Sequence, residues 1–199
     1  MNAFCADFPA NETEKETNQT TIPLSPASVG CDTCRYPVVM VHGLLASGDT
    51  WTSFQQLFTS NGYKPNLLYA FDWNTLAQGA NNAGTLDAFI DRVLAKTGAP
   101  KVRLIGHSAG GGLCYTYLSV ASRAAKTDGY VHIGSSVQSG PAGPGGSVPT
   151  LNIWSNGDKV ATGGNIAGAT NVQIPDQDHY QVATGAASFA AVWQFFHAK

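Results

Sequence analysis

The chain has 199 residues, a length that suits one domain rather than two. Hydrophobic residues make up 43% of it and charged residues only 12%, about half of the usual share of roughly 25%. The net charge of −2 and the lack of any Lys/Arg cluster argue against a nucleic-acid binder, and no apolar run approaches the ~18–20 residues that cross a bilayer. We therefore expect a soluble, monomeric globular protein.

Residues 1–35 differ in character from the rest of the chain. They are polar and carry three of the four cysteines: Cys5, Cys31 and Cys34. We expect a surface extension held by one disulfide, either Cys31–Cys34 or Cys5–Cys31. A disulfide indicates an oxidising compartment, so a secreted or periplasmic location is expected, although no signal peptide is visible. Cys114 should pack as a small buried hydrophobe.

From Tyr36 onward, apolar runs alternate with stretches of helical periodicity. In chain order we predict strand 37–41, helix 51–61, strand 67–73, helix 85–97, strand 101–106, helix 109–126, strands 130–137, 150–155 and 171–174, and a closing helix 188–197 that could start near Thr184. Strands that alternate with helices of this length imply βαβ units. We expect one α/β domain over residues 36–199, with about six mainly parallel strands and helices on both faces of the sheet.

The pentapeptide Gly-His-Ser-Ala-Gly at residues 106–110 matches the pattern G-x-S-x-G. It follows a predicted strand directly and opens a predicted helix, which is the position of a nucleophile elbow. There the backbone of Ser108 is strained and its hydroxyl stands at the carboxyl edge of the sheet. Gly106 and Gly110 are needed because a side chain would collide across so sharp a turn. An ordinary glycine-rich turn with a spectator serine is the less favoured alternative.

A nucleophilic serine needs a base and a group that orients the base. Three histidines follow Ser108 in the chain. His132 lies inside a predicted strand and is expected to be a structural histidine, and His197 should lie on the solvated face of the closing helix. His179 follows strand 171–174 on a loop at the carboxyl edge, so we prefer it as the base.

The orienting acid should lie on the loop after the preceding strand, since proteins with such a nucleophile elbow carry the three residues in the order Ser, acid, His. Asp158 follows strand 150–155 and is the obvious candidate. Asp178 adjoins His179, but neighbouring side chains on an extended loop usually diverge. Asp176 is kept as a minor alternative.

Two backbone N–H groups should stabilise the oxyanion of a tetrahedral intermediate. One is that of Ala109, at the start of the helix after the nucleophile. The other is that of Leu44, because Gly43 lets this part of the backbone approach the site closely. His42 precedes Ser108 in the chain, and we expect it to have a structural hydrogen-bonding role.

Four motifs together resemble those of bacterial α/β-hydrolase lipases, especially the small lidless class 2 lipases. They are Tyr-Pro-Val-Val-Met-Val-His-Gly (36–43), Gly-His-Ser-Ala-Gly (106–110), Ser-Asn-Gly-Asp (155–158) and Asp-His (178–179). The resemblance covers residues 36–199 and implies a minimal α/β-hydrolase fold without a cap. It also implies Ser108 as nucleophile, His179 as general base, Asp158 as its orienter, and Leu44 and Ala109 as oxyanion donors. The N-terminal extension and residues 139–149 depart from the usual small lipase.

The resemblance implies hydrolysis of carboxylic esters, such as lipids, through an acyl-enzyme intermediate and without a cofactor. Hydrolysis of polyesters or amides by the same residues is the alternative reaction. A non-catalytic binding module of the same fold is the alternative from another class, but Ser108, Asp158 and His179 all stand in the expected order. Asp176, Asp178 and His179 lack a fourth ligand and make a poor zinc site, so no metal is expected.

The sequence also predicts an open site. Residues 139–149 number eleven and include three prolines and four glycines, which leaves no room for a lid helix. Residues 74–84 are similarly short and rich in Asn and Gly. We therefore expect Ser108 to be open to solvent and rimmed by Leu44, Leu45 and Tyr180.

Overall fold

The computed structural model describes residues 36–77 and 81–198. In chain order its strands and helices are β1 (Val38–Val41), α1 (Thr52–Ser60), β2 (Leu68–Phe71), α2 (Asn82–Thr97), β3 (Val102–His107), α3 (Ala109–Leu118), α4 (Ala121–Ala124), β4 (Thr127–Ile133), β5 (Thr150–Trp154), β6 (Thr170–Gln173), α5 (Gln181–Thr184) and α6 (Ala186–His197). Three short 3₁₀ turns lie at Gly48–Trp51, Pro65–Leu67 and Pro144–Gly146. The predicted N-terminal extension and its disulfide lie outside the described residues.

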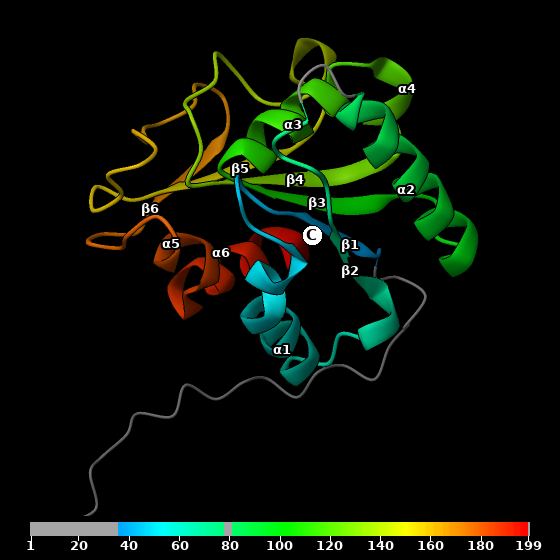
Figure 1. Ribbon diagram of the computed structural model, residues 1–199, viewed down its shortest axis with the longest axis horizontal. Helices are drawn as coiled ribbons and strands as arrows, with labels where there is room; N and C mark the ends of the chain where they lie inside the picture. The colour runs from blue at the N-terminus through cyan, green and yellow to red at the C-terminus, as the bar shows by residue number, and fades with distance from the viewer. Residues whose placement is uncertain (1–35, 78–80, 199) are drawn as a thin grey trace, which may run out of the picture. The chain divides into compact units, whose positions relative to one another are not determined.

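All six strands belong to one parallel sheet in the order β2-β1-β3-β4-β5-β6. Figure 1 shows α2 and α3 on one face of this sheet and α1 and α6 on the other. A strand covered on both faces should be apolar throughout, and the four residues of β1 are all fully buried. The predicted α/β architecture, a parallel sheet with helices on both faces, is confirmed.

Successive residues of β1 enter two separate hydrophobic cores, as the alternation of side chains along a strand requires. Val38 and Met40 face the core that α1 and α6 cover, with Phe54, Phe58 and Phe189 among its members. Val39 and Val41 face the core under α2 and α3, which also contains the free thiol of Cys114. Burial raises the pKa of that thiol, so Cys114 is an inert packing residue, as predicted.

Several predicted elements have different bounds in the structure. Strand 130–137 was placed too late, because β4 spans Thr127–Ile133 and ends where Gly134 takes a positive φ of +50°. Helix 109–126 is in fact two helices, since Val120 is extended (φ −95°, ψ 123°) and separates α3 from α4. Apolar periodicity runs through this break and therefore does not reveal it.

Helix α2 starts three residues before the predicted residue 85, at Asn82. The reason is a capping interaction: the side-chain oxygen of Asn81 accepts a hydrogen bond from the backbone N–H of Gly84 at 2.9 Å. Asn is among the best residues at this position because it satisfies a donor that the first helical turn leaves unpaired. The far end of α2 stops at Gly98, whose φ is +68°.

The connections from β4 to β5 and from β5 to β6 contain no α-helix. Parallel strands are usually joined through a helix. Here residues 134–149 and 155–169 cross over the sheet as irregular chain, with only the 3₁₀ turn Pro144–Gly146 inside the first. Among the described residues no helix forms a cap over the sheet, and none is long and apolar enough to cross a membrane.

The second crossover is held by the side-chain amide of Asn171 on β6. Its oxygen accepts hydrogen bonds from the amide of Asn152 at 2.9 Å and from the backbone N–H of Ile166 at 2.8 Å. Its amide donates to the carbonyl oxygens of Ile166 and Ala169, both at 2.9 Å. One side chain therefore provides the partners that a helix would otherwise have given this backbone.

Replacing Asn171 with Ala should lower the free energy of unfolding by about 3 kcal/mol, because the buried amide of Asn152 and the backbone of Ile166 and Ala169 together lose four hydrogen bonds. Asn165→Ala is the matched control: Asn165 accepts one exposed hydrogen bond from Trp154, and its loss should cost less than about 1 kcal/mol. Urea unfolding followed by tryptophan fluorescence measures both. Equal losses in the two variants would show that Asn171 does not hold the crossover.

Candidate active site

Ser108 lies between the end of β3 and the start of α3, in a strained backbone conformation. Its φ of +54° and ψ of −126° are rare for a residue with a side chain. Two hydrogen bonds to its carbonyl oxygen hold it there, from the N–H of Gly111 at 2.9 Å and from the hydroxyl of Ser135 at 2.8 Å. The strand–turn–helix geometry and the strain are those predicted for a nucleophile elbow.

The two glycines of the pentapeptide have no space for a side chain. A Cβ on Gly106 would lie 2.9 Å from the Sγ of Cys114 and from the carbonyl oxygen of Gly110. A Cβ on Gly110 would lie 2.5 Å from the carbonyl oxygen of Val41 and still closer to that of His42. The elbow therefore packs directly against the end of β1, backbone against backbone.

The loop after β1 approaches Ser108 just as closely. A Cβ on Gly43 would lie 2.9 Å from the Cβ of Ser108, so only glycine fits. Leu45 has a positive φ of +57°, and its N–H donates to the hydroxyl of Thr75 at 3.1 Å. Between these fixed points, the N–H of Leu44 has no hydrogen-bond acceptor among the described residues, and the same is true of Ala109.

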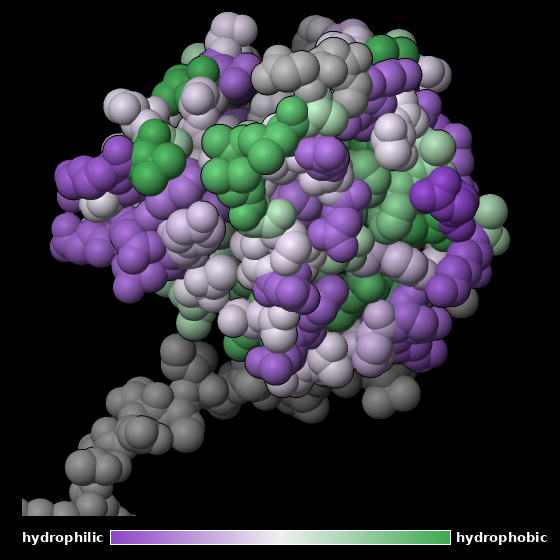
Figure 2. All heavy atoms as spheres, in the orientation of Figure 1, coloured by the Kyte–Doolittle hydropathy of each residue, from purple (hydrophilic) through white to green (hydrophobic). Residues whose placement is uncertain are grey.

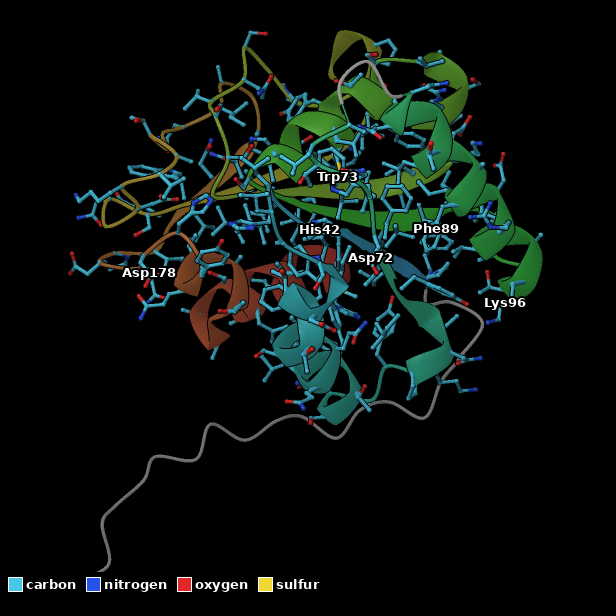
Figure 3. The ribbon with its side chains drawn as sticks, in the orientation of Figure 1. His42, Asp72, Trp73, Phe89, Lys96 and Asp178 are labelled. Atoms are coloured by element: carbon cyan, nitrogen blue, oxygen red, sulfur yellow. The ribbon has the colours of Figure 1, made fainter. Side chains whose placement is uncertain are left out.

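His42 holds this loop and does not face the nucleophile with a free nitrogen. Its Nδ1 donates to the carbonyl oxygen of Gly43 at 2.9 Å, and its Nε2 accepts from the backbone N–H of Trp73 at 3.2 Å. The indole N–H of Trp73 donates to the carbonyl oxygen of His42 at 3.1 Å, and the two rings lie side by side in Figure 3. The structural hydrogen-bonding role predicted for His42 is what the geometry gives.

Asp158 and His179 are brought together from two different loops, one after β5 and one after β6. The Nδ1 of His179 lies 2.8 Å from the Oδ2 of Asp158, and both side chains are almost fully buried. The other carboxylate oxygen, Oδ1, accepts from the backbone N–H groups of Val160 at 2.8 Å and Ala161 at 3.0 Å. Burial by itself raises the pKa of Asp158, but these hydrogen bonds outweigh it and the pKa lies below the ordinary 3.8. Asp158 is therefore an anion at neutral pH.

The two alternative acids have other positions. The Oδ1 of Asp178 accepts from the N–H groups of Tyr180 at 2.9 Å and Gln181 at 2.8 Å, so it caps the short helix α5, and Figure 3 shows it beside that helix. Asp176 has a positive φ of +58°, and its carboxylate makes no hydrogen bond to the ring of His179. Among the described residues, only Asp158 bonds to that ring.

Two residues of the Ser-Asn-Gly-Asp motif tie the loop of the acid to the loop of the base. The hydroxyl of Ser155 accepts from the N–H groups of Gly157 at 3.1 Å and Gln177 at 3.0 Å. The side-chain oxygen of Asn156 accepts from the N–H of Asp176 at 3.0 Å. The sequence motif does not predict the contacts with Gln177 and Asp176, because they join two loops that are about twenty positions apart and follow different strands.

The other two histidines do not belong to this group. His132 is a fully buried histidine whose Nδ1 lies 2.8 Å from the hydroxyl of Tyr130 and whose Nε2 lies 3.0 Å from the carbonyl oxygen of Ser136. The structural role predicted for it is confirmed. The prediction for His197 is wrong: its ring is half-buried and stacks on Trp193 with the ring centroids 4.0 Å apart.

An open cavity of about 410 Å³ lies beside Ser108. Its lining combines the elbow with the two irregular crossovers: Ser108, Ala109, Gly112, Ser135, Ser136, Gln138, Val160, Ala161 and Thr162. Leu44, Leu45 and Tyr180, the predicted apolar rim, are 51%, 72% and 57% exposed, and none of the three lines this cavity. Figure 2 shows hydrophobic side chains in a few small clusters on this face of the molecule. Among the hydrogen bonds of the described residues, none joins the hydroxyl of Ser108 to the ring of His179; catalytic hydrogen bonds often tighten only when substrate binds.

In the part of the chain that the structure describes, no three His, Cys, Asp or Glu side chains gather closely enough to hold a metal ion. The chemistry available at this edge of the sheet is that of a strained serine, a histidine with a buried anionic partner, and backbone N–H groups without acceptors.

Comparison with known proteins gives this arrangement a family. The sequence profile of a family described as lipase (class 2) matches residues 35–140. A triacylglycerol lipase of Burkholderia plantarii is 41% identical over 101 residues, which are 46% of this chain and 28% of that protein. One from Pseudarthrobacter phenanthrenivorans is 40% identical over 84 residues, 39% of this chain and 26% of that protein. The chain thus spans less than a third of the length of these two curated relatives.

A solved structure is similar over most of the fold. The mature form of a Bacillus licheniformis lipase superposes with a TM-score of 0.67 at 15% sequence identity, covering 84% of this chain and 94% of that one. At this identity the likeness is one of fold, and it agrees with the α/β-hydrolase architecture expected from the motifs.

Gly110→Ala should destabilise the protein by more than about 2 kcal/mol, because its Cβ would overlap the carbonyl oxygens at the end of β1. Gly112, on the same helix, has no atom within 4 Å of its Cβ position. Gly112→Ala should therefore stabilise the helix by about 0.5–1 kcal/mol. Thermal unfolding of the two variants gives the comparison. A Gly110→Ala variant as stable as Gly112→Ala would contradict the close packing of the elbow on β1.

Proposed function

Because this chain belongs to the class 2 lipase family, we propose that it hydrolyses carboxylic esters with Ser108, His179 and Asp158 as a catalytic triad. The observation that carries the proposal is the hydrogen bond of 2.8 Å between Asp158 and His179, at the edge of the sheet where β3 presents a strained serine. A buried carboxylate that stays charged and bonds to one nitrogen of a histidine is not expected of residues without a catalytic role.

The pairing fixes which nitrogen of His179 does the chemistry. An anionic Asp158 accepts a hydrogen bond, so the proton of the neutral ring lies on Nδ1 and Nε2 keeps its lone pair. This Nε2 takes the proton of Ser108 as the serine oxygen forms a bond to the ester carbonyl carbon. The imidazolium that results is stabilised by the buried anion beside it.

The reaction then proceeds through two tetrahedral intermediates. Collapse of the first breaks the bond from carbon to the alcohol oxygen, and the alcohol leaves with the proton held by His179, which gives an acyl-enzyme on Ser108. Water attacks this acyl-enzyme and passes a proton to His179, and the second collapse releases the carboxylic acid and returns the proton to Ser108. The N–H groups of Leu44 and Ala109, which have no other acceptor among the described residues, would bind the oxyanion in both steps.

The surroundings of Ser108 favour esters of apolar acids. Leu44, Leu45 and Tyr180 offer exposed apolar surface on the loops that carry Gly43 and His179, and the cavity lined by Ser108 is open. A lipid-like ester fits such a rim. A polyester chain would fit it too, so a substrate panel must contain nitrophenyl esters of different acyl length, a triglyceride emulsion, a polyester film and an amide.

We further propose that the protein acts without a cofactor, as a monomer, in a secreted or periplasmic location. The cysteine-bearing extension supports the location, since disulfides persist in oxidising compartments. Alkylation and intact-mass analysis of non-reduced protein would show two free thiols if one disulfide is present.

A fluorophosphonate probe should label the folded protein, and Ser108→Ala should abolish both labelling and ester hydrolysis, because the probe reacts only with an activated serine. Labelling that persists in Ser108→Ala would place the nucleophile elsewhere. No labelling of the folded wild type would favour a non-catalytic binding module.

The acid is tested by comparing two neighbouring carboxylates. Asp158→Asn should lower kcat by about 10²–10⁴-fold, because the imidazole loses the anion that sets its tautomer. Asp178→Asn should cost less than about tenfold, since Asn also caps a helix well and Asp178 does not contact the ring of His179. Steady-state hydrolysis of a soluble nitrophenyl ester measures both values. The reverse ranking would move the acid to the loop before α5.

The absence of a cap over the described part of the site predicts simple kinetics. The rate with a short-chain triglyceride should rise smoothly as its concentration passes the solubility limit, because no helix has to move before substrate reaches Ser108. Titrating the released acid across that limit gives the curve. A sharp jump at the limit would contradict the open site.

A further inference from the structure

His107 has no part in the chemistry proposed above, although it directly precedes the nucleophile. It is the last residue of β3, and its side chain is 1% exposed. Its Nε2 lies 2.9 Å from the backbone carbonyl oxygen of His179, and the two imidazole rings pack with their centroids 4.6 Å apart. The residue before the nucleophile is therefore bonded to the backbone of the base.

The chemistry of this contact fixes the state of the His107 ring. A carbonyl oxygen can only accept, so Nε2 carries the proton and donates it. The other nitrogen, Nδ1, has no hydrogen-bond partner among the described residues. Burial and the neighbouring His179 lower the pKa of His107 from 6.5 to about 4, so the ring is neutral at the pH at which His179 would act as a base. A neutral donor holds the loop without opposing the positive charge that His179 gains in the reaction.

The ring is also fixed sterically, in a slot between the two strands that flank β3. A Cβ on Gly43, after β1, would lie 3.3 Å from the Nδ1 of His107. A Cβ on Gly134, after β4, would lie 3.3 Å from its Cδ2 and 3.4 Å from its Nε2. A glycine thus follows each of the two neighbouring strands where the ring lies, and a larger side chain at either position would have to displace the ring.

We propose that His107 is a positioning residue: its Nε2–H fixes the backbone of His179 relative to Ser108, so that nucleophile and base share one rigid connection. Asp158 orients the ring of His179 from the side of β5, and His107 fixes its main chain from the side of β3. This inference rests on the proposed function, because the positions it sets are those of the proposed nucleophile and base.

The test uses variants of the full chain that differ in the donor. His107→Gln keeps an N–H near the position of Nε2, whereas His107→Asn is one methylene shorter and His107→Leu has no donor. With a soluble nitrophenyl ester, His107→Leu and His107→Asn should lower kcat about 10–100-fold with KM within about threefold, since misplacing a catalytic group by about 1 Å costs rate rather than binding. His107→Gln should recover kcat to within about fivefold of the wild type.

His132→Leu is the matched control, because His132 is a second buried histidine of neutral ring that does not touch His179. Its free energy of unfolding in urea should fall as that of His107→Leu does, but its kcat per folded molecule should equal that of the wild type. If His107→Gln is as slow as His107→Asn, or if His107→Leu keeps full kcat, the positioning role is wrong.

A second readout does not depend on turnover. The backbone carbonyl ¹³C resonance of His179, which reports a hydrogen bond to that oxygen, should move in His107→Leu and His107→Asn and keep its wild-type position in His107→Gln. An identical resonance in all variants overturns the proposal. Failure of the proposed function would look different, since the wild type itself would then neither hydrolyse esters nor react with the fluorophosphonate probe.

Discussion

The lack of space around Ser108 is the constraint on which the rest of the site depends. The turn from β3 into α3 lies against the end of β1 so closely that neither Gly43 nor Gly110 can carry a Cβ. The close packing of these backbones leaves no room for a side chain between Gly43 and Ser108. The strain in Ser108 is tolerated because two hydrogen bonds to its carbonyl oxygen and the parallel sheet behind it hold the turn in place.

Charge is confined to one place in this buried region. The rings of His107 and His132 are neutral because burial lowers the pKa of each to about 4. Asp158 differs from both because three hydrogen bonds to its carboxylate compensate for its burial. Asp158 is thus a fixed anion beside the ring of His179, and it would stabilise a proton taken up by that ring.

The sequence was sufficient to predict the parts of this molecule that depend on local pattern. The apolar strand 37–41 is followed by Gly43, and the apolar strand 101–106 leads into the pentapeptide 106–110 with its two glycines. From these two patterns the parallel sheet and the sharp turn at Ser108 could be predicted. The break between α3 and α4 could not be seen, because Val120 continues the apolar pattern while its backbone leaves the helix. His197 was misjudged since its stacking on Trp193 depends on how the last turn of α6 packs.

Contacts between distant loops were likewise out of reach of a single sequence. Ser155 and His107 each form a hydrogen bond to the backbone of the loop that follows β6, and no spacing along the sequence predicts such a bond. The preference for Asp158 over Asp178 rests on chain order and on the expectation that neighbouring side chains on an extended loop diverge. The structure adds a physical reason, because the carboxylate of Asp178 is used by the first turn of α5.

The two crossovers without helices and the sheet they join differ in how readily they accept changes of sequence. The sheet and the elbow fix Ser108, whereas residues 134–149 and 155–169 supply most of the cavity wall beside it. Irregular surface segments accept insertions and substitutions more readily than helices packed on a sheet. The lining of this cavity could therefore diverge by substitution within these two segments, provided that Ser135 and Asp158 keep their hydrogen bonds to Ser108 and His179.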